Sequence, residues 1–408
     1  MQLAIDHSSK QIATKLVITG SKSETNRLLL LQALYPELTI ENASNSDDSV
    51  AMAKALNSSD TLKDIHHAGT AMRFLTAYFA TKSDSSIVLT GSKRMQERPI
   101  GLLVDALNSL GASIAYDKNE GYPPLLIEGK QLEGGEVSLP ANISSQYISA
   151  LLLIAPKLTN GLVLHLEGEI TSLPYIKMTL ALLERIGIST TFDGKSIRVP
   201  YHSNVLAQEQ IVESDWSSAS YWFSSLALCE EGEIILTNYR EDSLQGDRVL
   251  LDIYQKLGVQ YHFGKEGLQL KKEKGFILPN RLALDLVEAP DIAQTIAVSC
   301  YGLGVECELT GLHTLKIKET DRLLALEKEL GKLGATITVT NDSLHLSSKQ
   351  NFQEGQAIDT YHDHRMAMAF APLGLKLPLK VNDAGVVTKS YPSFWEDMQI
   401  AGFQMVEK

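Results

Sequence analysis

The apolar residues of the chain repeat one pattern. A stretch with apolar side chains at helical spacing ends in Leu-Gly or a close variant, and a short run typical of a strand follows. Four copies are clear: Leu102–Tyr116, Leu180–Phe192, Leu250–Phe263 and Leu323–Val339. A fifth copy, at residues 394–406, is weaker. Glycine is expected directly after a helix, because it accepts a positive φ angle. The pattern therefore predicts helices that end at glycines and lead into strands.

These helix-ending glycines recur at a spacing of roughly 70 residues, as internal repeats do. They are Gly111, Gly187, Gly258, Gly334 and Gly402. About six such units fit the chain, or two sets of three, although helix–glycine–strand successions also occur in unrelated α/β proteins. The expected strands are short and not continuously apolar, which favours mixed over purely parallel sheets. We predict an α/β or α+β fold with an internal boundary near residues 212–215, where "DWSSASYWF" begins a helix.

Composition and charge narrow the class of protein. Hydrophobic residues make up 44% of the 408 residues and charged residues 21%, values typical of a folded globular chain. The net charge of -12 argues against a general nucleic-acid binder. The sequence predicts no membrane helix and no signal peptide, so we expect a cytoplasmic protein. The three cysteines form no CxxC motif and are expected to be buried, reduced thiols: Cys229, Cys300 and Cys307.

Four predicted helices begin with a capping cluster and a cation in the first turn. A cation is unfavourable there, by about 0.3–1 kcal/mol, because the N-terminus of a helix carries partial positive charge. Each cation alone could point to solvent, but four in an acidic chain indicate that anions such as phosphate or carboxylate bind at these ends. The four clusters are Lys22, Ser23 and Arg27; Gly69, Thr70 and Arg73; Lys318, Thr320 and Arg322; and Asp363, His364 and Arg365.

Other segments add polar groups that suit an anionic ligand. Arg94 and Arg98 precede a helix expected near Pro99. Three neutral donors at a further helix start are either phosphate or hydroxyl ligands or plain caps: Ser144, Ser145 and Gln146. The segment "TSLPYIKM" offers Ser172 and Tyr175, and Lys389 lies on an expected loop, where a lone lysine is usually solvated.

Two acidic residues are candidates for proton transfer. Asp291 follows a proline and precedes an apolar helix, where helix capping is the alternative role. Glu319 lies between Lys318 and Arg322, so charge pairing alone is an alternative for it, and these cations favour its ionised form. Four histidines lack the carboxylate or cysteine spacing of a metal site, so no metal and no cofactor is expected: His66, His67, His362 and His364.

Taken together, the motifs resemble the family of 5-enolpyruvylshikimate-3-phosphate synthase, or 3-phosphoshikimate 1-carboxyvinyltransferase. "GSKSETNR", "AGTAMR", "RMQERPIG", "SSQYISALL", "DWSSASY", "LQGD", "KETDRL" and "DHRMAMAFA" match in order over nearly the whole chain. The resemblance implies the enolpyruvyl transferase fold, an inside-out α/β barrel of two similar domains, each with three βαβαββ-type repeats. It also implies an N-terminal domain at residues 20–213, mainly for shikimate 3-phosphate. The C-terminal domain, residues 1–19 and 214–408, would mainly bind phosphoenolpyruvate, with the active site in the cleft between the domains.

The resemblance also implies which residues bind each substrate. The shikimate 3-phosphate set is Lys22, Ser23, Arg27, Ser144, Ser145, Gln146, Ser172, Tyr175, Asp291 and Lys318. The phosphoenolpyruvate set is Lys22, Gly69, Arg98, Gln146, Arg322, Arg365 and Lys389. Arg73 and Arg94 match motif positions without a defined contact.

The implied reaction adds the shikimate 5-hydroxyl to C2 of phosphoenolpyruvate as C3 is protonated, and the tetrahedral intermediate then loses phosphate. Asp291 is the candidate base for the hydroxyl, and Glu319 and Lys22 are candidates for the other proton transfers. Lysines and arginines can supply the electrostatic stabilisation without a metal. The enzyme is expected to act as a monomer on small molecules, with no nucleic-acid or membrane partner.

Two departures from the family pattern and two alternative functions remain. His67 stands where the family usually has Asn, and Thr314 where relatives can carry an Asn that contacts the shikimate phosphate side. One alternative is the sibling enzyme with UDP-N-acetylglucosamine as acceptor, which usually carries a loop cysteine that this chain lacks between Arg94 and Pro99. The other is a non-catalytic binder of phosphorylated metabolites, which would bind phosphate but release none.

Overall fold

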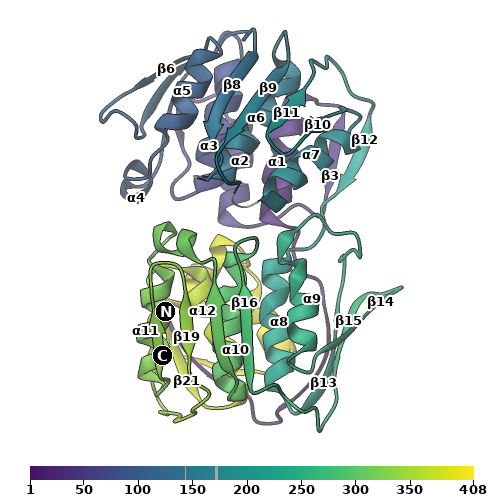
Figure 1. The fold of residues 1–408 in the computed structure, drawn as a ribbon, viewed down its shortest axis with the longest axis vertical. Coiled ribbons are helices and arrows are strands. Elements are labelled where there is room, and N and C mark those ends of the chain that lie inside the picture. The colour runs from purple at the N-terminus through teal and green to yellow at the C-terminus, as the bar shows by residue number, and fades with distance from the viewer. Residues whose placement is uncertain (143, 171–172) are drawn as a thin grey trace. The chain divides into compact units, whose positions relative to one another are not determined.

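A computed structural model describes residues 1–142, 144–170 and 173–408. The chain divides into a continuous unit, Gly20–Val212, and a discontinuous unit, Met1–Thr19 with Glu213–Lys408 (Figure 1). The observed boundary differs by one residue from the expected 20–213. Glu213 belongs to the discontinuous unit because its buried carboxylate accepts hydrogen bonds there from Trp216 Nε1, at 2.8 Å, and Ser243 Oγ, at 2.5 Å.

The sheets of both units follow one topology. The described residues form six sheets, three in each unit. Five of them place a parallel pair of strands beside two antiparallel strands, as in the order β4-β5-β7-β6. The sixth, β12-β3, consists of a parallel pair alone. The prediction of mixed sheets in an α/β fold is therefore confirmed.

The continuous unit contains ten strands and seven α-helices among its described residues. The strands are β3 (Leu38–Glu41), β4 (Leu62–Asp64), β5 (Ser86–Thr90), β6 (Ser113–Tyr116), β7 (Leu125–Glu128), β8 (Gly135–Pro140), β9 (Leu162–Glu167), β10 (Thr191–Phe192), β11 (Ser196–Val199) and β12 (Gln208–Ile211). The helices are α1 (Lys22–Leu34), α2 (Asp47–Asn57), α3 (Gly69–Thr81), α4 (Lys93–Gln96), α5 (Gly101–Ser109), α6 (Ser145–Ile154) and α7 (Leu173–Arg185), with a 3₁₀ turn η1 (Ala155–Lys157).

The discontinuous unit begins with β1 and resumes at α8. Its strands are β1 (Gln2–Asp6), β2 (Gln11–Leu16), β13 (Glu231–Leu236), β14 (Gln260–Gly264), β15 (Gly267–Lys272), β16 (Arg281–Asp285), β17 (Glu306–Thr310), β18 (Ile337–Val339), β19 (Leu344–Leu346), β20 (Ala357–Ile358), β21 (Leu379–Asn382) and β22 (Gln404–Glu407). Its α-helices are α8 (Trp216–Leu228), α9 (Leu250–Gln255), α10 (Ala293–Leu303), α11 (Arg322–Lys332), α12 (His364–Phe370) and α13 (Phe394–Ile400). Its 3₁₀ turns are η2 (Gly246–Val249), η3 (Pro290–Ile292), η4 (His313–Ile317), η5 (Ala371–Leu375) and η6 (Ala384–Lys389).

The repeating glycines end helices as their spacing predicted. All five have φ angles between 90° and 98°, a region that other residues rarely adopt. They follow α5, α7, α9, α11 and α13, in the order Gly111, Gly187, Gly258, Gly334 and Gly402. The recurrent pattern in the sequence thus corresponds to a recurrent helix end in both units.

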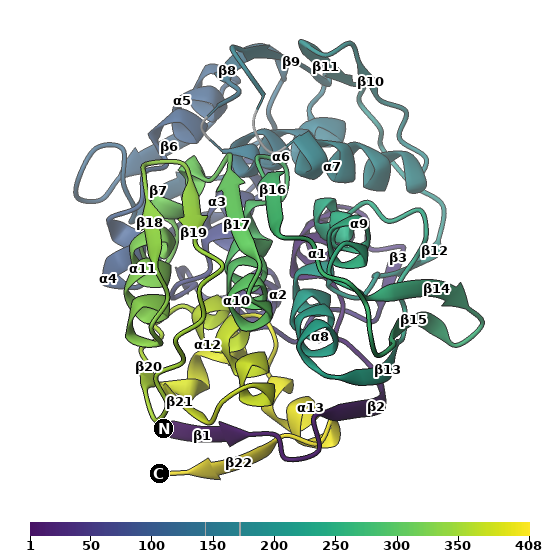
Figure 2. The ribbon, with the colours of Figure 1, turned by 60° about the horizontal axis from the view of Figure 1, so that its bottom comes forward.

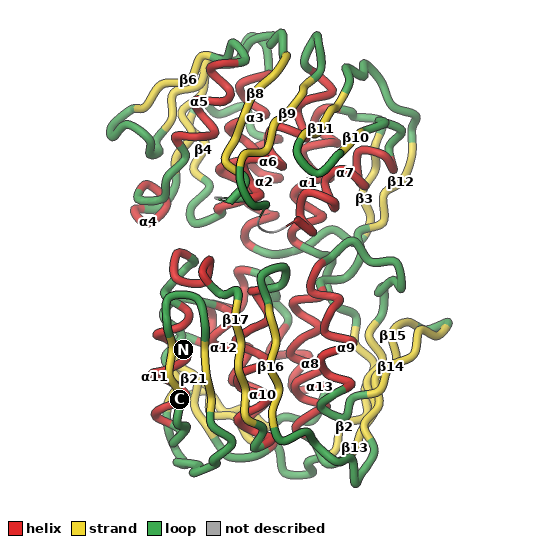
Figure 3. Tube along the Cα trace, viewed as in Figure 1, coloured by secondary structure: helices red, strands yellow, loops and turns green. Residues whose placement is uncertain are grey.

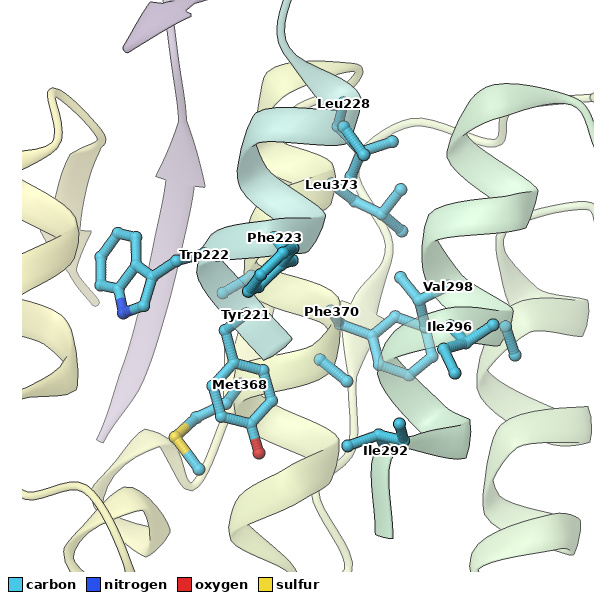
Figure 4. Packing of buried hydrophobic residues seen from close by; sticks show 14 of the residues in the cluster. Tyr221, Trp222, Phe223, Leu228, Ile292, Ile296, Val298, Met368, Phe370 and Leu373 are labelled. Atoms are coloured by element: carbon cyan, nitrogen blue, oxygen red, sulfur yellow. The ribbon is translucent and has the colours of Figure 1, made fainter. Parts of the chain in front are cut away.

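Several helices are buried on nearly every side, which a helix does only when it is apolar all round. In α8 every residue except Ser217 is buried, and in α10 every residue except Leu303. Figure 3 shows helices and strands in separate colours, and the α8–α10 pair lies among the strands of its own unit. Figure 4 shows Phe223 of α8 and Ile296 of α10 in one cluster with Phe370 of α12. The core of this unit is therefore helical, with sheets around it.

The first strand of the chain completes a sheet with the last ones. Strand β1 pairs antiparallel with β21 on one side and with β22 on the other (Figure 2). Strand β2 then pairs in parallel with β13, with Leu16 opposite Leu236. The nineteen residues before the continuous unit are thus built into two sheets of the discontinuous unit.

Candidate active site

Helices α3, α6 and α8 are buried except for residues in their first turns, which are partly accessible. The last residue of α3 is also partly accessible. The accessible residues of the first turns are Thr70 in α3, Ser145 and Gln146 in α6, and Ser217 in α8. Backbone N–H groups at such ends have no partner within the helix. The predicted starts of α1, α3, α6, α11 and α12 are confirmed. The accessible parts of these otherwise buried helices are thus polar groups in their first turns.

Arg27 of α1 connects three helices of the continuous unit. Its Nε donates to Thr179 Oγ1 at 2.8 Å, and its Nη2 donates to Ser149 Oγ at 3.0 Å and to the Tyr175 carbonyl at 3.3 Å. Its Nη1 donates to the Ser23 carbonyl at 2.7 Å. Burial lowers the pKa of Arg27 to about 10, so the guanidinium still carries its charge at neutral pH. The structure thus brings Ser23, Arg27 and Tyr175 together.

The N-terminus of α3 contacts the guanidinium of Arg98. A Cβ atom on Gly69 would lie 2.5 Å from Arg98 Nη1, so a larger residue at position 69 would require the Arg98 guanidinium to shift. Arg73, one turn further along α3, donates to the Gly69 carbonyl at 3.2 Å and to the Pro99 carbonyl at 2.9 Å. Burial, and then the charge of Arg98, lowers the pKa of Arg73 to about 10. Arg73 is therefore a buried support for the segment that carries Arg98.

Arg94 lies in different surroundings from Arg98. It belongs to the short helix α4 and is exposed, with Nη1 3.4 Å from Glu97 Oε2. The next helix, α5, begins at Gly101 rather than near Pro99. Ser92 caps α4 by accepting from the Met95 backbone N–H, a local bond that the apolar pattern does not encode.

The start of α6 lies against that of α3. Ser144 caps the helix by accepting from the Gln146 backbone N–H at 3.3 Å, and Gln146 Nε2 donates to Thr70 Oγ1, also at 3.3 Å. Ser144 therefore caps α6, and Gln146 in the same segment contacts the start of α3. Ser172, the remaining predicted residue here, lies outside the described residues.

Lys22 is the first residue of α1 and faces the start of α2. Its Nζ is 3.9 Å from Asp48 Oδ2, and the neighbouring Asp47 Oδ2 is 3.9 Å from His67 Nε2. Histidine at position 67, the departure from the family pattern, therefore lies near an acidic helix start. Asp48 was not among the predicted site residues, although two aspartates after Ser46 are a typical helix start.

In the discontinuous unit, Arg322 is held by three carboxylates. Its Nε donates to Asp363 Oδ2 at 2.6 Å, its Nη1 to Asp291 Oδ1 at 2.7 Å and its Nη2 to Glu319 Oε2 at 2.8 Å. Burial lowers the pKa of Arg322, but these carboxylates raise it further than burial lowers it. Arg322 is thus a fixed, permanently charged centre on the first turn of α11.

Asp291 receives two further cations. Lys318 Nζ is 3.5 Å from Asp291 Oδ1, and Arg365 Nη2 is 3.4 Å from Asp291 Oδ2. Arg365 Nη1 also donates to the Asp291 carbonyl at 3.2 Å. The capping role considered for Asp291 is wrong, since it lies inside η3 and α10 begins after Ile292 without a side-chain cap. Five predicted residues therefore meet here: Asp291, Lys318, Glu319, Arg322 and Arg365.

Lys389 reaches the same region from η6. It is the last residue of this 3₁₀ turn rather than part of an irregular loop, and its Nζ donates to the His362 carbonyl at 2.6 Å. His362 is two residues from the start of α12. Lys389 is thus placed beside the segment that carries Arg365.

Asp363, which the sequence groups with Arg365, completes this cluster together with two residues that were not predicted, Ser217 and Asp247. Asp363 caps α12 through Oδ1, which accepts from the Arg365 backbone N–H at 2.9 Å, while its Oδ2 binds Arg322. Ser217 accepts from Arg365 Nη2 at 3.3 Å and donates to Asp247 at 2.5 Å. Burial, and then the charge of Asp291, raises the pKa of Asp247 to about 6. Their motifs "DHR", "DWSS" and "LQGD" were visible, but nothing in the sequence indicated that they meet.

Within the described ranges, no group of three or more His, Cys, Asp or Glu side chains is arranged to hold a metal ion. No helix there is both long and apolar enough to cross a bilayer. The three cysteines are free and buried.

The family model, the related sequences and the solved structures that match this chain all cover most or all of it. The family model for EPSP synthase (3-phosphoshikimate 1-carboxyvinyltransferase) matches residues 53–398. A 3-phosphoshikimate 1-carboxyvinyltransferase of Bacteroides fragilis is 46% identical over 402 residues, 96% of each chain. The fold resembles EPSP synthase from Acinetobacter baumannii (TM-score 0.80, 21% identity, all of both chains). It also resembles the enolpyruvyl transferase NikO from Streptomyces tendae (TM-score 0.73, 14% identity, 100% and 99% covered). The chain therefore belongs to the EPSP synthase (3-phosphoshikimate 1-carboxyvinyltransferase) family.

Proposed function

We propose that side chains of both units contribute to one site for the two substrates of the family's reaction. The chain transfers the enolpyruvyl (1-carboxyvinyl) group of phosphoenolpyruvate to the 5-hydroxyl of shikimate 3-phosphate and releases phosphate. This is the shikimate-pathway step toward chorismate and the aromatic amino acids. Each substrate carries a phosphate and a carboxylate. The observation that carries the assignment of residues is the gathering of cations at helix starts in a chain of net charge -12.

Shikimate 3-phosphate binds mainly to the continuous unit in this proposal. The residues are Lys22, Ser23, Arg27, Ser144, Ser145, Gln146, Ser172 and Tyr175, with Asp291 and Lys318 from the discontinuous unit. The start of α6 supports this assignment, because its hydroxyl and amide groups match the neutral hydroxyls and phosphate of the substrate. Arg27 lies beneath them as a buried positive charge whose position is fixed by four hydrogen bonds.

Phosphoenolpyruvate binds mainly to the discontinuous unit, through Arg322, Arg365 and Lys389. Lys22, Gly69, Arg98 and Gln146 are the proposed contributions of the continuous unit. Asp291, Glu319 and Asp363 hold the two arginines in place, so little conformational entropy is lost when an anion binds. Guanidinium groups suit both ends of this substrate because they bind carboxylate and phosphate in a bidentate manner.

The reaction needs a base for the hydroxyl and a proton for C3. In the first step the 5-hydroxyl oxygen bonds to C2 while C3 gains a proton, which gives a tetrahedral intermediate. In the second, C3 loses a proton and the bond from C2 to the phosphate oxygen breaks. We assign the hydroxyl proton to Asp291, and the protons at C3 and at the leaving phosphate to Glu319 and Lys22. The fixed cations stabilise the negative charge that develops on the leaving phosphate.

A phosphate-release assay with shikimate 3-phosphate and phosphoenolpyruvate, with and without EDTA, tests the reaction. We expect release with both substrates present, unchanged by EDTA, and none with UDP-N-acetylglucosamine as acceptor. Phosphate release with that acceptor alone would identify the sibling activity. Binding of both substrates without any release would identify a non-catalytic binder.

Arg98→Ala tests the assignment of the residues. It should raise the KM for phosphoenolpyruvate by about 10- to 100-fold, the equivalent of one charged hydrogen-bonding group, and change the KM for shikimate 3-phosphate far less. Arg94→Ala is the matched control, since Arg94 is exposed on the same segment and pairs only weakly with Glu97. An equal rise of both KM values in Arg98→Ala would remove Arg98 from the phosphoenolpyruvate set.

A further inference from the structure

The turn between β20 and α12 has an unusual backbone. Tyr361 and His362 are consecutive non-glycine residues in the left-handed region, with φ angles of 53° and 57°. Residues with a Cβ atom disfavour this conformation, and it persists only where several contacts with the surrounding structure stabilise it. The sequence has no glycine at either position to relieve it. Something outside the turn must therefore hold it.

This turn and the next residue, Asp363, hydrogen-bond the side chains of Lys389 and Arg322 and the backbone of Arg365. These are the three residues of the discontinuous unit assigned to phosphoenolpyruvate. Asp363, the residue that follows it, accepts from Arg322 Nε at 2.6 Å and from the Arg365 backbone N–H at 2.9 Å. Lys389 Nζ donates to the His362 carbonyl at 2.6 Å. A shift of the turn would therefore move the partners of Arg322, Arg365 and Lys389 together.

Glu329 of α11 holds the other side of the turn. Its side chain is 0% exposed, and its Oε1 accepts from Tyr361 Oη at 2.5 Å. Its Oε2 accepts from the Asp359 backbone N–H at 3.0 Å and from Lys332 Nζ at 2.7 Å. Both carboxylate oxygens are thus engaged, and two of the three donors belong to the strand end and the turn.

Glu329 and Arg322 lie on the same helix, about two turns apart, and so on nearly the same face. Arg322 donates a hydrogen bond to Asp363, and Glu329 accepts hydrogen bonds from Tyr361 and Asp359. Helix α11 therefore fixes the segment 359–363 at both of its ends. A buried carboxylate is unfavourable unless it is paired and hydrogen-bonded, which this arrangement provides.

We propose that Glu329 and Tyr361 are positioning residues for phosphoenolpyruvate binding, which act by holding the left-handed turn that places Arg322, Arg365 and Lys389. Neither side chain is assigned a contact with substrate, and the inference rests on the proposed function. A purely structural role would lower the melting temperature without a selective effect on one substrate. A positioning role affects the KM for phosphoenolpyruvate specifically.

Tyr361→Phe removes only the hydroxyl and tests the proposal. Tyr301→Phe is its matched control, because Tyr301 Oη makes a buried bond of 2.6 Å in the same unit to the Leu333 carbonyl at the end of α11, not to a group of the turn. We expect Tyr361→Phe to raise the KM for phosphoenolpyruvate about tenfold, with kcat and the KM for shikimate 3-phosphate within about twofold of the wild type. Tyr301→Phe should leave all three values within about twofold, at a similar melting temperature.

Glu329→Gln perturbs the same bond from its other end and serves if Tyr361→Phe does not fold. It should raise the KM for phosphoenolpyruvate selectively as well. The effects of the two single variants should not add in the double variant, because they share the bond between Tyr361 and Glu329. Equal effects in Tyr361→Phe and Tyr301→Phe, or equal rises for both substrates, would overturn the inference while the wild-type activity still supports the proposed function. A wild-type chain that releases no phosphate would overturn the proposed function and the inference with it.

Discussion

Replacement of Asp363 should strongly destabilise the discontinuous unit. Asp363 is fully buried, and its two oxygens have different tasks: Oδ2 binds Arg322, and Oδ1 caps α12 at the Arg365 backbone N–H. Asp363→Ala removes both contacts. Asp363→Asn keeps the shape but turns one acceptor into a donor, so that only one of the two contacts can persist.

The expected loss in free energy of unfolding for Asp363→Ala follows from these two contacts. Removal of one partner from a buried ion pair costs about 3–5 kcal/mol, and loss of an N-cap costs about 0.5–2 kcal/mol. Arg322 keeps Asp291 and Glu319 as partners, which places the sum for Asp363→Ala near the lower end, at about 3–4 kcal/mol. For a unit of this size, that corresponds to a fall in melting temperature of about 6–16 °C.

Differential scanning calorimetry at neutral pH measures this fall, with guanidinium unfolding as the second method. Glu266→Ala is the control, because Glu266 pairs with Lys15 at 2.8 Å on the exposed surface of the same unit. Such exposed pairs contribute about 1 kcal/mol at most. If Asp363→Ala and Glu266→Ala unfolded at the same temperature, the reasoning from buried charge would be refuted.

Two further predictions concern buried ionisable groups. Burial raises the pKa of Asp247 to about 6, above its value of about 3.9 in an unfolded chain. The folded state therefore holds the proton more tightly, and the free energy of unfolding falls as pH rises from about 4 to 6. Asp247→Asn should flatten this part of the stability profile measured by urea unfolding, and an unchanged slope would contradict the assignment. The cysteines Cys229, Cys300 and Cys307 are buried, and burial raises the pKa of Cys229 to about 11, so a thiol reagent at pH 8 should label none of them in the native protein and all three in guanidinium. Rapid native labelling would mean that the helices around them open readily.

The sequence predicted features that depend on neighbours along the chain. Helix-ending glycines, the capping role considered for Ser144, and cations in first turns all arise within a few residues, and their positions agree with the structure. Mixed sheets followed from strand length and composition. The family resemblance was equally accessible, because it rests on short motifs in a fixed order.

The sequence could not predict contacts between distant segments. Asp291 meets Lys318, Arg322 and Arg365 through folding alone, and no local signal distinguishes it from the helix cap that the sequence suggested. Arg27 was expected among substrate ligands, and its four bonds to other protein groups could not be foreseen. Pairing of this kind depends on which helices pack together, which local propensity does not determine.

The place of β1 has a consequence for synthesis on the ribosome. This strand is made before the other described strands, and its partners β21 and β22 follow more than 370 residues later, tens of seconds at about 5–20 residues per second. The segment Gly20–Val212 needs no later residue for its own sheets, so it can fold while translation continues. Meanwhile the nascent β1 and β2 stay unpaired, exposing alternating apolar side chains to chaperones or to strands of other chains.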